Sequence, residues 1–368
     1  MRHPSWKTSR RQLAQLFMGS RVNCAKCHNH PFENWTQDDY YSIAAVFVRV
    51  KHAGKTPIVS VADSGETKHP TSGRTLSPYG VEATADPKAD RRVAFAAWLT
   101  KPGNPFFARV EVNRTWARLF GRGIVHPVDD FRSSNPPAIP ELLDALARSS
   151  RSSLGFDRKH IVRLICNSQT YQRSTATNKF NEDDESLFSH YPIRRLTAEQ
   201  LQDAIGYTTG SLPLPSDLPI SLEKAEKGAA PPNDKGKQAA LKKLRDRADY
   251  ATQRLTPEQS QFLMAFGQPK RESPCACERI DEPTVDQALQ LLNGQLVAGK
   301  LTAAASRYAK LADGELIDRL WLAAFSRLPS EAERKKATDH LKRGENRPDA
   351  VRDLVWAVMN TREFLLQH

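Results

Sequence analysis

From residue 87 onward, apolar residues recur at helical spacing, and most segments that carry this pattern also carry helix start and stop signals. PKADRRVAFAAWLTK and NPFFARVEVNRTWARLFG are two of these segments, and Gly121 is a stop signal for the second. The pattern continues to the ending PDAVRDLVWAVMNTREFLLQH. Because strand-like alternation is scarce, the sequence predicts a mainly α, multi-helical protein with a small N-terminal helical segment and a larger helical domain.

Two further helices are predicted around the cysteine-containing stretch VNCAKCHNHPFENW. The first is RRQLAQLFM, with Thr8 or Ser9 as its cap and Gly19 as its stop. The second lies in TQDDYYSIAAVFVRV, where Thr36 and Asp39 have the spacing of a capping box. The cysteine motif is therefore expected in a short connection between two packed helices.

Composition shifts divide the chain into three predicted parts. Residues 1–50 form the segment that carries the cysteine motif, and residues 51–86 are a linker or loop rich in Gly, Pro, Ser and Thr, with one short strand at PIVSV. Residues 87–368 form the helical domain, which contains a Pro- and Lys-rich insertion near 211–255.

The composition narrows the classes of partner. The 368-residue chain has a formal charge of +12, but its Lys and Arg residues are scattered, so nucleic acid is not the expected partner. No apolar run approaches the ~18 residues of a membrane span. The basic N-terminus has its apolar residues at helical spacing, so we expect no export signal within this chain.

The motif C-x-x-C-H is the signature of c-type haem attachment. Two thiols at this spacing reach the two vinyl groups on one edge of the porphyrin, and the following histidine then ligates the iron. Cys24, Cys27 and His28 would take these roles. The neighbouring candidates for a sixth iron ligand, among which the sequence does not decide, are Met18, His30, His52 and His69.

A zinc site is the competing interpretation. C-x-x-C is half of many structural zinc sites, and Cys275 and Cys277 would complete a four-thiolate shell with Cys24 and Cys27. Alternatively, His28 or His30 would supply nitrogen ligands to the same metal.

Two weaker interpretations of the cysteines remain. A thioredoxin-like dithiol calls for a βαβ pattern, which the sequence lacks. The simplest alternative is two buried structural cysteines beside a surface histidine. The downstream pair Cys275 and Cys277 would, without a metal, lie in a tight loop or form a strained, labile disulfide.

Other polar clusters give no evidence of catalysis. Asp129 and Asp130 are adjacent, but side chains of neighbouring residues in extended chain point in opposite directions. The two therefore need not share a site, and one of them is expected to pair with a nearby arginine. The sequence contains no nucleophile elbow, phosphate-binding loop or zincin helix, so enzymatic activity is left open.

Several long motifs carry a family resemblance. RRQLAQLFMGSRVNCAKCHNHPFENWTQDDYYSIAAVF resembles the closing part of the planctomycete cytochrome-C-like domain of unknown function. WLTKPGNPFFARVEVNRTWARLFGRGIVHPVDDFRSSNPPAIPELLDALA is similar to the start of the helical domain of unknown function that follows it in the same large proteins. Later landmarks of that second domain are RRLTAEQLQDAIGYTTG, FGQPKRESPCACER, PTVDQALQLLNG and NTREFLLQH.

The resemblance implies that the chain is the C-terminal part of a longer periplasmic or secreted protein. It supplies no activity, and it assigns the family's C-x-x-C-H to Cys24, Cys27 and His28. The leading hypothesis is an exported protein that binds c-type haem for electron transfer or redox sensing, with a redox or cell-surface protein as partner. The alternative is a non-enzymatic structural or interaction protein with a zinc site formed by the C-x-x-C and C-x-C cysteines.

Overall fold

The computed structural model confirms the mainly helical class, with 53% helix and 5% strand. It describes residues 13–52, 59–81, 88–151, 155–212, 255–269, 279 and 282–367. The predicted caps Thr8 and Ser9 and nearly all of the insertion near 211–255 lie outside these ranges. In the part of the chain that is described, no helix is both long and apolar enough to cross a membrane.

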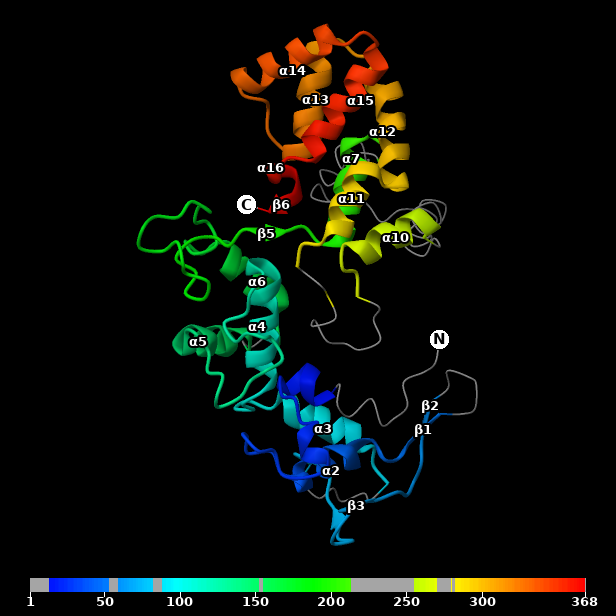
Figure 1. Ribbon diagram of the computed structural model, residues 1–368. Coiled ribbons are helices and arrows are strands. Elements are labelled where there is room, and N and C mark those ends of the chain that lie inside the picture. The colour runs from blue at the N-terminus through cyan, green and yellow to red at the C-terminus, as the bar shows by residue number, and fades with distance from the viewer. Residues whose placement is uncertain are drawn as a thin grey trace, which may run out of the picture. The chain divides into compact units, whose positions relative to one another are not determined.

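The helices belong to two compact units (Figure 1). Unit 1 comprises the described residues up to Ile193, and unit 2 comprises those from Arg194 onward. Each unit has its own buried apolar residues, so each is considered separately. This division by contacts differs from the division by composition, and the predicted boundary at 51–86 stays a prediction.

Unit 1 begins with a π-helical turn, Ala14–Met18, which ends at Gly19 in the left-handed conformation expected of a helix stop. A 3₁₀ turn, Cys24–Lys26, leads to helix α2, Gln37–Phe47. The predicted capping box of α2 is confirmed, because the Thr36 side chain accepts from the Asp39 amide and the Asp39 carboxylate accepts from the Thr36 amide.

Two short antiparallel hairpins follow α2, where the sequence predicts one strand. Strand β1, Val50–His52, pairs with β2, Val59–Val61, with Val50 opposite Val61. Strand β3, Thr67–Lys68, pairs with β4, Thr75–Leu76. The predicted strand at PIVSV corresponds to β2, and β1 was not predicted. Strands β3 and β4 have two residues each, too few to leave an alternating pattern in the sequence.

The rest of unit 1 is helical, and its apolar residues form two clusters. The helices are α3, Arg91–Thr100; α4, Phe107–Phe120; α5, Pro140–Ser150; and α6, Arg158–Cys166. Helix α4 packs against both α5 and α6. One cluster gathers α4, α5 and α6 around the stacked rings of Trp116 and Phe120. The other joins the cysteine-containing segment to α2 and α3 through Met18, Ala25 and Phe95.

In the described part of unit 2, the regular structure is helical apart from one very short strand pair. Its helices are α7, Ala198–Thr208; α10, Pro257–Ala265; α11, Val285–Asn293; α12, Gln295–Tyr308; α13, Asp313–Phe325; α14, Glu331–Arg343; α15, Arg347–Met359; and α16, Arg362–Leu365. Four of them start with capping boxes, at Thr197, Thr256, Thr284 and Ser330. Each box supplies partners for backbone amides that a helix start leaves free.

The first and last described residues of unit 2 contact each other although they are far apart in the sequence. Strand β5, Arg194–Arg195, pairs antiparallel with β6, Leu366–Gln367. Helices α13, α14 and α15 pack against one another around a single apolar core (Figure 1). This arrangement ties the last residues of the chain to the first helix of unit 2.

The core of unit 2 yields a direct test on helix α13. Leu320 is fully buried, so Leu320→Ala should lower the free energy of unfolding by about 2–5 kcal/mol through lost burial and the cavity left behind. Leu322 on the same helix is 48% exposed, so Leu322→Ala should change stability by less than about 0.5 kcal/mol. Urea titration followed by circular dichroism measures both, and equal losses would contradict the assigned core.

Candidate cysteine–histidine site

The two cysteines of the motif flank a 3₁₀ turn on the surface of unit 1. The Cys27 amide donates to the Cys24 carbonyl oxygen at 3.4 Å. With three residues per turn, positions i and i+3 of such a turn lie on the same side. Both thiols are free and exposed, whereas Ala25 between them is fully buried in the apolar cluster. The buried alanine therefore fixes the turn with its cysteines directed toward solvent.

The next residue, His28, is exposed and has a defined tautomer. Its Nδ1 lies 2.6 Å from the Asn29 carbonyl oxygen. Because a carbonyl oxygen only accepts hydrogen bonds, Nδ1 carries the proton and Nε2 of the neutral ring carries the lone pair. Metal-ligating histidines characteristically donate their other ring N–H to such an acceptor. His28 thus presents Nε2 in the state that a metal ligand requires.

His30 has the opposite arrangement. Its Nδ1 accepts from the Phe32 amide at 3.3 Å, so the proton of the neutral ring is on Nε2. The His30 amide itself donates to the Trp35 carbonyl oxygen at 2.8 Å, which closes the loop between these two residues. His30 therefore supports the loop, and ligation through Nε2 would first require its proton to leave.

The loop is attached to the start of helix α2. The Gln37 amide donates to Asn29 Oδ1 at 2.9 Å, and Gln37 Nε2 donates to the Lys26 carbonyl oxygen at 3.0 Å. These bonds hold residues on both sides of His28 against the helix. They also satisfy one of the backbone amides that the helix start leaves without a partner.

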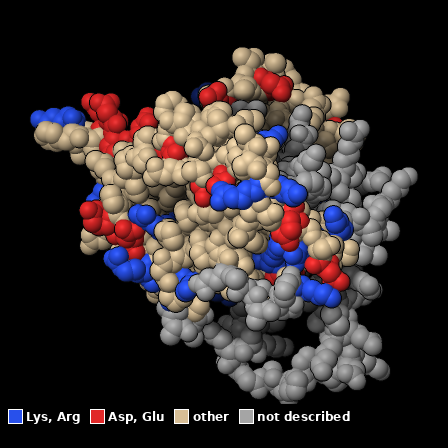
Figure 2. All heavy atoms as spheres, turned by 90° about the horizontal axis from the view of Figure 1, so that it is seen from below, with Lys and Arg blue, Asp and Glu red and all other residues tan. Residues whose placement is uncertain are grey.

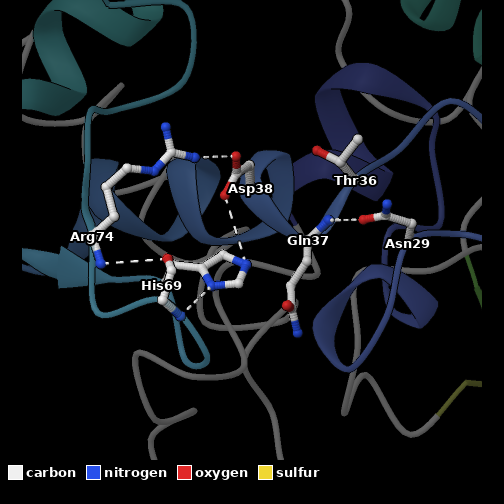
Figure 3. Close-up of a pocket in the computed structure, with 7 residues that line it drawn as sticks. Asn29, Thr36, Gln37, Asp38, His69 and Arg74 are labelled. Carbon is white, nitrogen blue, oxygen red and sulfur yellow. Dashed lines mark hydrogen bonds and ion pairs between the residues drawn. The ribbon is translucent and has the colours of Figure 1, made fainter.

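A polar cleft opens beside this attachment (Figure 3). Its lining residues come from the loop, from α2 and from the β3–β4 hairpin, and they are Asn29, Thr36, Gln37, Asp38, His69, Ser72 and Arg74. Arg74 forms an ion pair with Asp38, and His69 Nε2 lies 3.7 Å from Asp38 Oδ1. His69 Nδ1 accepts from the amides of Thr71 and Ser72, both at 3.2 Å, so this ring supports the hairpin turn.

Met18 and His52 are the other candidates for a sixth iron ligand. Met18 is fully buried in the apolar cluster, so its sulfur is not available without opening that core. The side chain of His52 lies outside the described residues. No candidate for the sixth position other than His30 lies in the same loop as His28.

The two aspartates that the sequence singled out have separate partners, and Asp129 contacts the segment that leads into this loop. Asp129 is 2% exposed and accepts from Arg21 at 2.7 Å and from Gln15. Asp130 is 4% exposed and pairs with Arg132 at 2.6 Å. The two carboxylates thus have different partners, and the pairing of Asp130 with Arg132 agrees with the expectation that one of them pairs with a nearby arginine. The pairing of Asp129 with Arg21, 108 residues away, has no signal in the sequence.

The segment around Asp129 also contacts the cysteine-containing region through its backbone. The Phe131 amide donates to the Gly19 carbonyl oxygen at 2.9 Å. A Cβ at Gly19 would lie 2.6 Å from the Phe131 ring and 2.7 Å from Val110, and φ is +64° there, so the position requires glycine. On the other side of the loop, the Ser133 amide and hydroxyl both donate to the Glu33 carboxylate at 3.2 Å.

The surroundings of Asp129 favour its ionised form. Burial opposes ionisation, but the hydrogen bonds from Arg21 and Gln15 and the charge of Arg21 outweigh it, so the pKa of Asp129 lies below its ordinary value. The ion pair is therefore complete at neutral pH.

The remaining sequence-predicted ligands belong to the second cysteine pair. Cys275 and Cys277 lie outside the described residues, so the four-thiolate zinc site stays a prediction. Within the described ranges, no three His, Cys, Asp or Glu side chains are arranged so that they could hold a metal ion together. The fifth cysteine, Cys166, is a half-buried free thiol at the end of α6.

Charges on the molecular surface are mixed. Figure 2 shows Lys and Arg side chains interspersed with Asp and Glu on the face in view. Many arginines form ion pairs with neighbouring carboxylates, for example Arg109 with Asp144 at 2.8 Å and Arg347 with Asp313 at 2.7 Å. The net positive charge is thus partly compensated locally rather than gathered on the face shown.

Fold and site together define a mainly helical protein whose first unit presents a C-x-x-C-H loop at its surface. Residues 91–341 match the family model PSD1, a protein of unknown function (DUF1553), and residues 2–52 match PSCyt2, a protein of unknown function (DUF1549). No curated protein and no solved structure gives a match. Because the first match covers more than half of the chain, the protein belongs to the PSD1 family, and the order of the two matches confirms the resemblance seen in the sequence.

The ion pair of Asp129 predicts a pH-dependent stability difference. A carboxylate with a lowered folded-state pKa contributes stability above its unfolded pKa of ~3.9, and this contribution is lost as the pH falls through the folded value. Asp129→Asn should lower the free energy of unfolding by about 1–3 kcal/mol at pH 7, and the difference from wild type should shrink below about pH 4.

Urea unfolding at a series of pH values measures this effect. Asp144→Asn is the matched control, because Asp144 is 43% exposed in its pair with Arg109 and its loss should cost less than about 1 kcal/mol. A deficit for Asp129→Asn that stays constant down to the lowest pH would contradict the assigned role of the ionised carboxylate.

Proposed function

We propose that this protein carries a covalently attached c-type haem on Cys24 and Cys27, with His28 as an iron ligand, and that it serves electron transfer or redox sensing. The observation that carries the proposal is the combination of two exposed thiols on one turn with a histidine whose Nε2 holds a lone pair. A haem bound there would supply a reversible one-electron couple.

The residues present fit attachment chemistry. Each thiol S–H adds across one vinyl C=C bond, so that one C–S and one C–H bond form and nothing leaves. This addition requires two accessible thiols on one side of the chain, which the 3₁₀ turn provides. The large apolar side chain of Phe32 is 74% exposed in the same loop and is free to cover an apolar macrocycle.

The proposal extends to location and partners. Thioether attachment of haem takes place outside the cytoplasm, so the protein would act in the periplasm or after secretion, as part of a longer chain. Its partner would be a redox or cell-surface protein, with the larger helical region as scaffold or docking module.

Covalent haem content is the first test. Protein exported from a host with cytochrome-c maturation machinery should give one haem per chain in a pyridine haemochrome spectrum and in intact mass. Cys24→Ser and Cys27→Ser should each lose one thioether bond, whereas Cys166→Ser should leave the content unchanged. Wild-type protein with no covalent haem would overturn the proposal, and stoichiometric zinc in its place would support the alternative of a structural zinc site with Cys275 and Cys277.

The histidine tautomers give a second test. His28→Ala should change the absorption and electron paramagnetic resonance spectra of the iron, because the ligand that carries the free lone pair is removed. His30→Ala should leave these spectra close to those of wild type, because His30 Nδ1 is used in the loop. The reverse pattern would show that the ligand is assigned to the wrong residue.

A further inference from the structure

We infer that the segment 127–135 is a positioning element for the C-x-x-C-H loop, and that Asp129 and Glu33 are its positioning residues. This inference rests on the proposed function. The loop lies in the region that matches PSCyt2, whereas residues 127–135 lie in the region that matches PSD1. The two family regions would therefore build a single cofactor-binding unit.

The upstream contact fixes the chain just before the first cysteine. Asp129 is buried and holds Arg21, the third residue before Cys24, together with Gln15 from the preceding turn. Between Arg21 and the cysteine, Val22 is 2% exposed and belongs to the same apolar cluster as Ala25. A shift of Arg21 is therefore passed on to the turn that directs the thiols.

The downstream contact fixes the chain just after the histidines. Glu33 accepts from the amide and the hydroxyl of Ser133, each at 3.2 Å. Glu33 lies inside the loop that the bond from the His30 amide to the Trp35 carbonyl oxygen closes. The segment 127–135 thus holds the C-x-x-C-H loop on both sides.

Holding a short loop at both ends reduces the conformational freedom of the residues between. Two thiols and one imidazole that must meet one group benefit directly, because each has to be held close to its productive position for all three bonds to form. Asp129 on the upstream side is buried and Glu33 on the downstream side is half-buried, whereas their partners Arg21 and Ser133 are exposed. Both contacts lie within unit 1, so the loop is held before any cofactor arrives.

Hydrogen exchange of the cofactor-free protein tests the upstream contact without any assumption about haem. Ala25, Lys26 and Cys27 donate backbone hydrogen bonds within the turn, so their amides report its opening. In Asp129→Asn, one carboxylate oxygen is replaced by an NH₂ group, which cannot accept a hydrogen bond from Arg21 or Gln15. Hydrogen exchange at the backbone amides of Ala25, Lys26 and Cys27 should therefore rise about tenfold or more. Amides of α4 and α5 should be unaffected, and Asp144→Asn should change neither group.

An unchanged turn in Asp129→Asn, or an equal rise throughout unit 1, would overturn the inference. Should this buried variant fail to fold, Glu33→Ala provides the same test from the surface side of the loop, with faster exchange expected at the His30 amide. Glu33→Gln keeps an acceptor oxygen at the same distance and should retain most of the protection.

In haem-loaded protein, the midpoint potential of the haem distinguishes loss of the Glu33 charge from loss of the Glu33 hydrogen bonds to Ser133. Glu33→Ala and Glu33→Gln remove the same charge, but only the alanine variant removes the acceptor for Ser133. We expect the potential to shift in Glu33→Ala and to stay near wild type in Glu33→Gln, and equal potentials in both variants would count against positioning. Absence of haem from wild-type protein would overturn the proposed function alone, and the exchange measurements would then decide this inference.

Discussion

The buried carboxylate of Asp129 is the constraint on which the cysteine-containing part of unit 1 depends. A carboxylate that is 2% exposed is stable only with partners that compensate for lost water, and two such partners, Arg21 and Gln15, come from the segment before the cysteines. In the same segment as Asp129, the Phe131 amide donates a hydrogen bond to the Gly19 carbonyl oxygen. Satisfying one buried charge therefore fixes the path of the chain that leads into the C-x-x-C-H motif.

The motif combines a rigid base with exposed reactive groups. Ala25 is buried in the apolar cluster and holds the turn in place, while the thiols of Cys24 and Cys27 are exposed to solvent. The two histidines of the loop have different hydrogen-bonding roles. His30 accepts from the backbone and shapes the loop, whereas His28 donates to the backbone and keeps its other nitrogen free.

Unit 2 follows simpler rules, and nothing in its described part resembles the cysteine–histidine site. Four of its described helices begin at capping boxes. The apolar faces of its helices converge on one core that includes Leu316, Ile317 and Leu320 of α13. The short pairing of β5 with β6 joins the two ends of the unit. Such a unit is suited to support and docking, which is the role proposed for the larger helical region.

The sequence by itself determined the helical class, the capping box of α2 and the identity of the cysteine motif, because these depend on residues at most a few positions apart. Thr36 with Asp39 is a clear case, since both partners lie in one helical turn. Only the tertiary structure decided that Asp129 pairs with Arg21 and that Glu33 meets Ser133, because these contacts join residues about 100 positions apart. The tautomers of His28 and His30 also required coordinates, since each is set by the acceptor or donor that the folded loop places beside the ring.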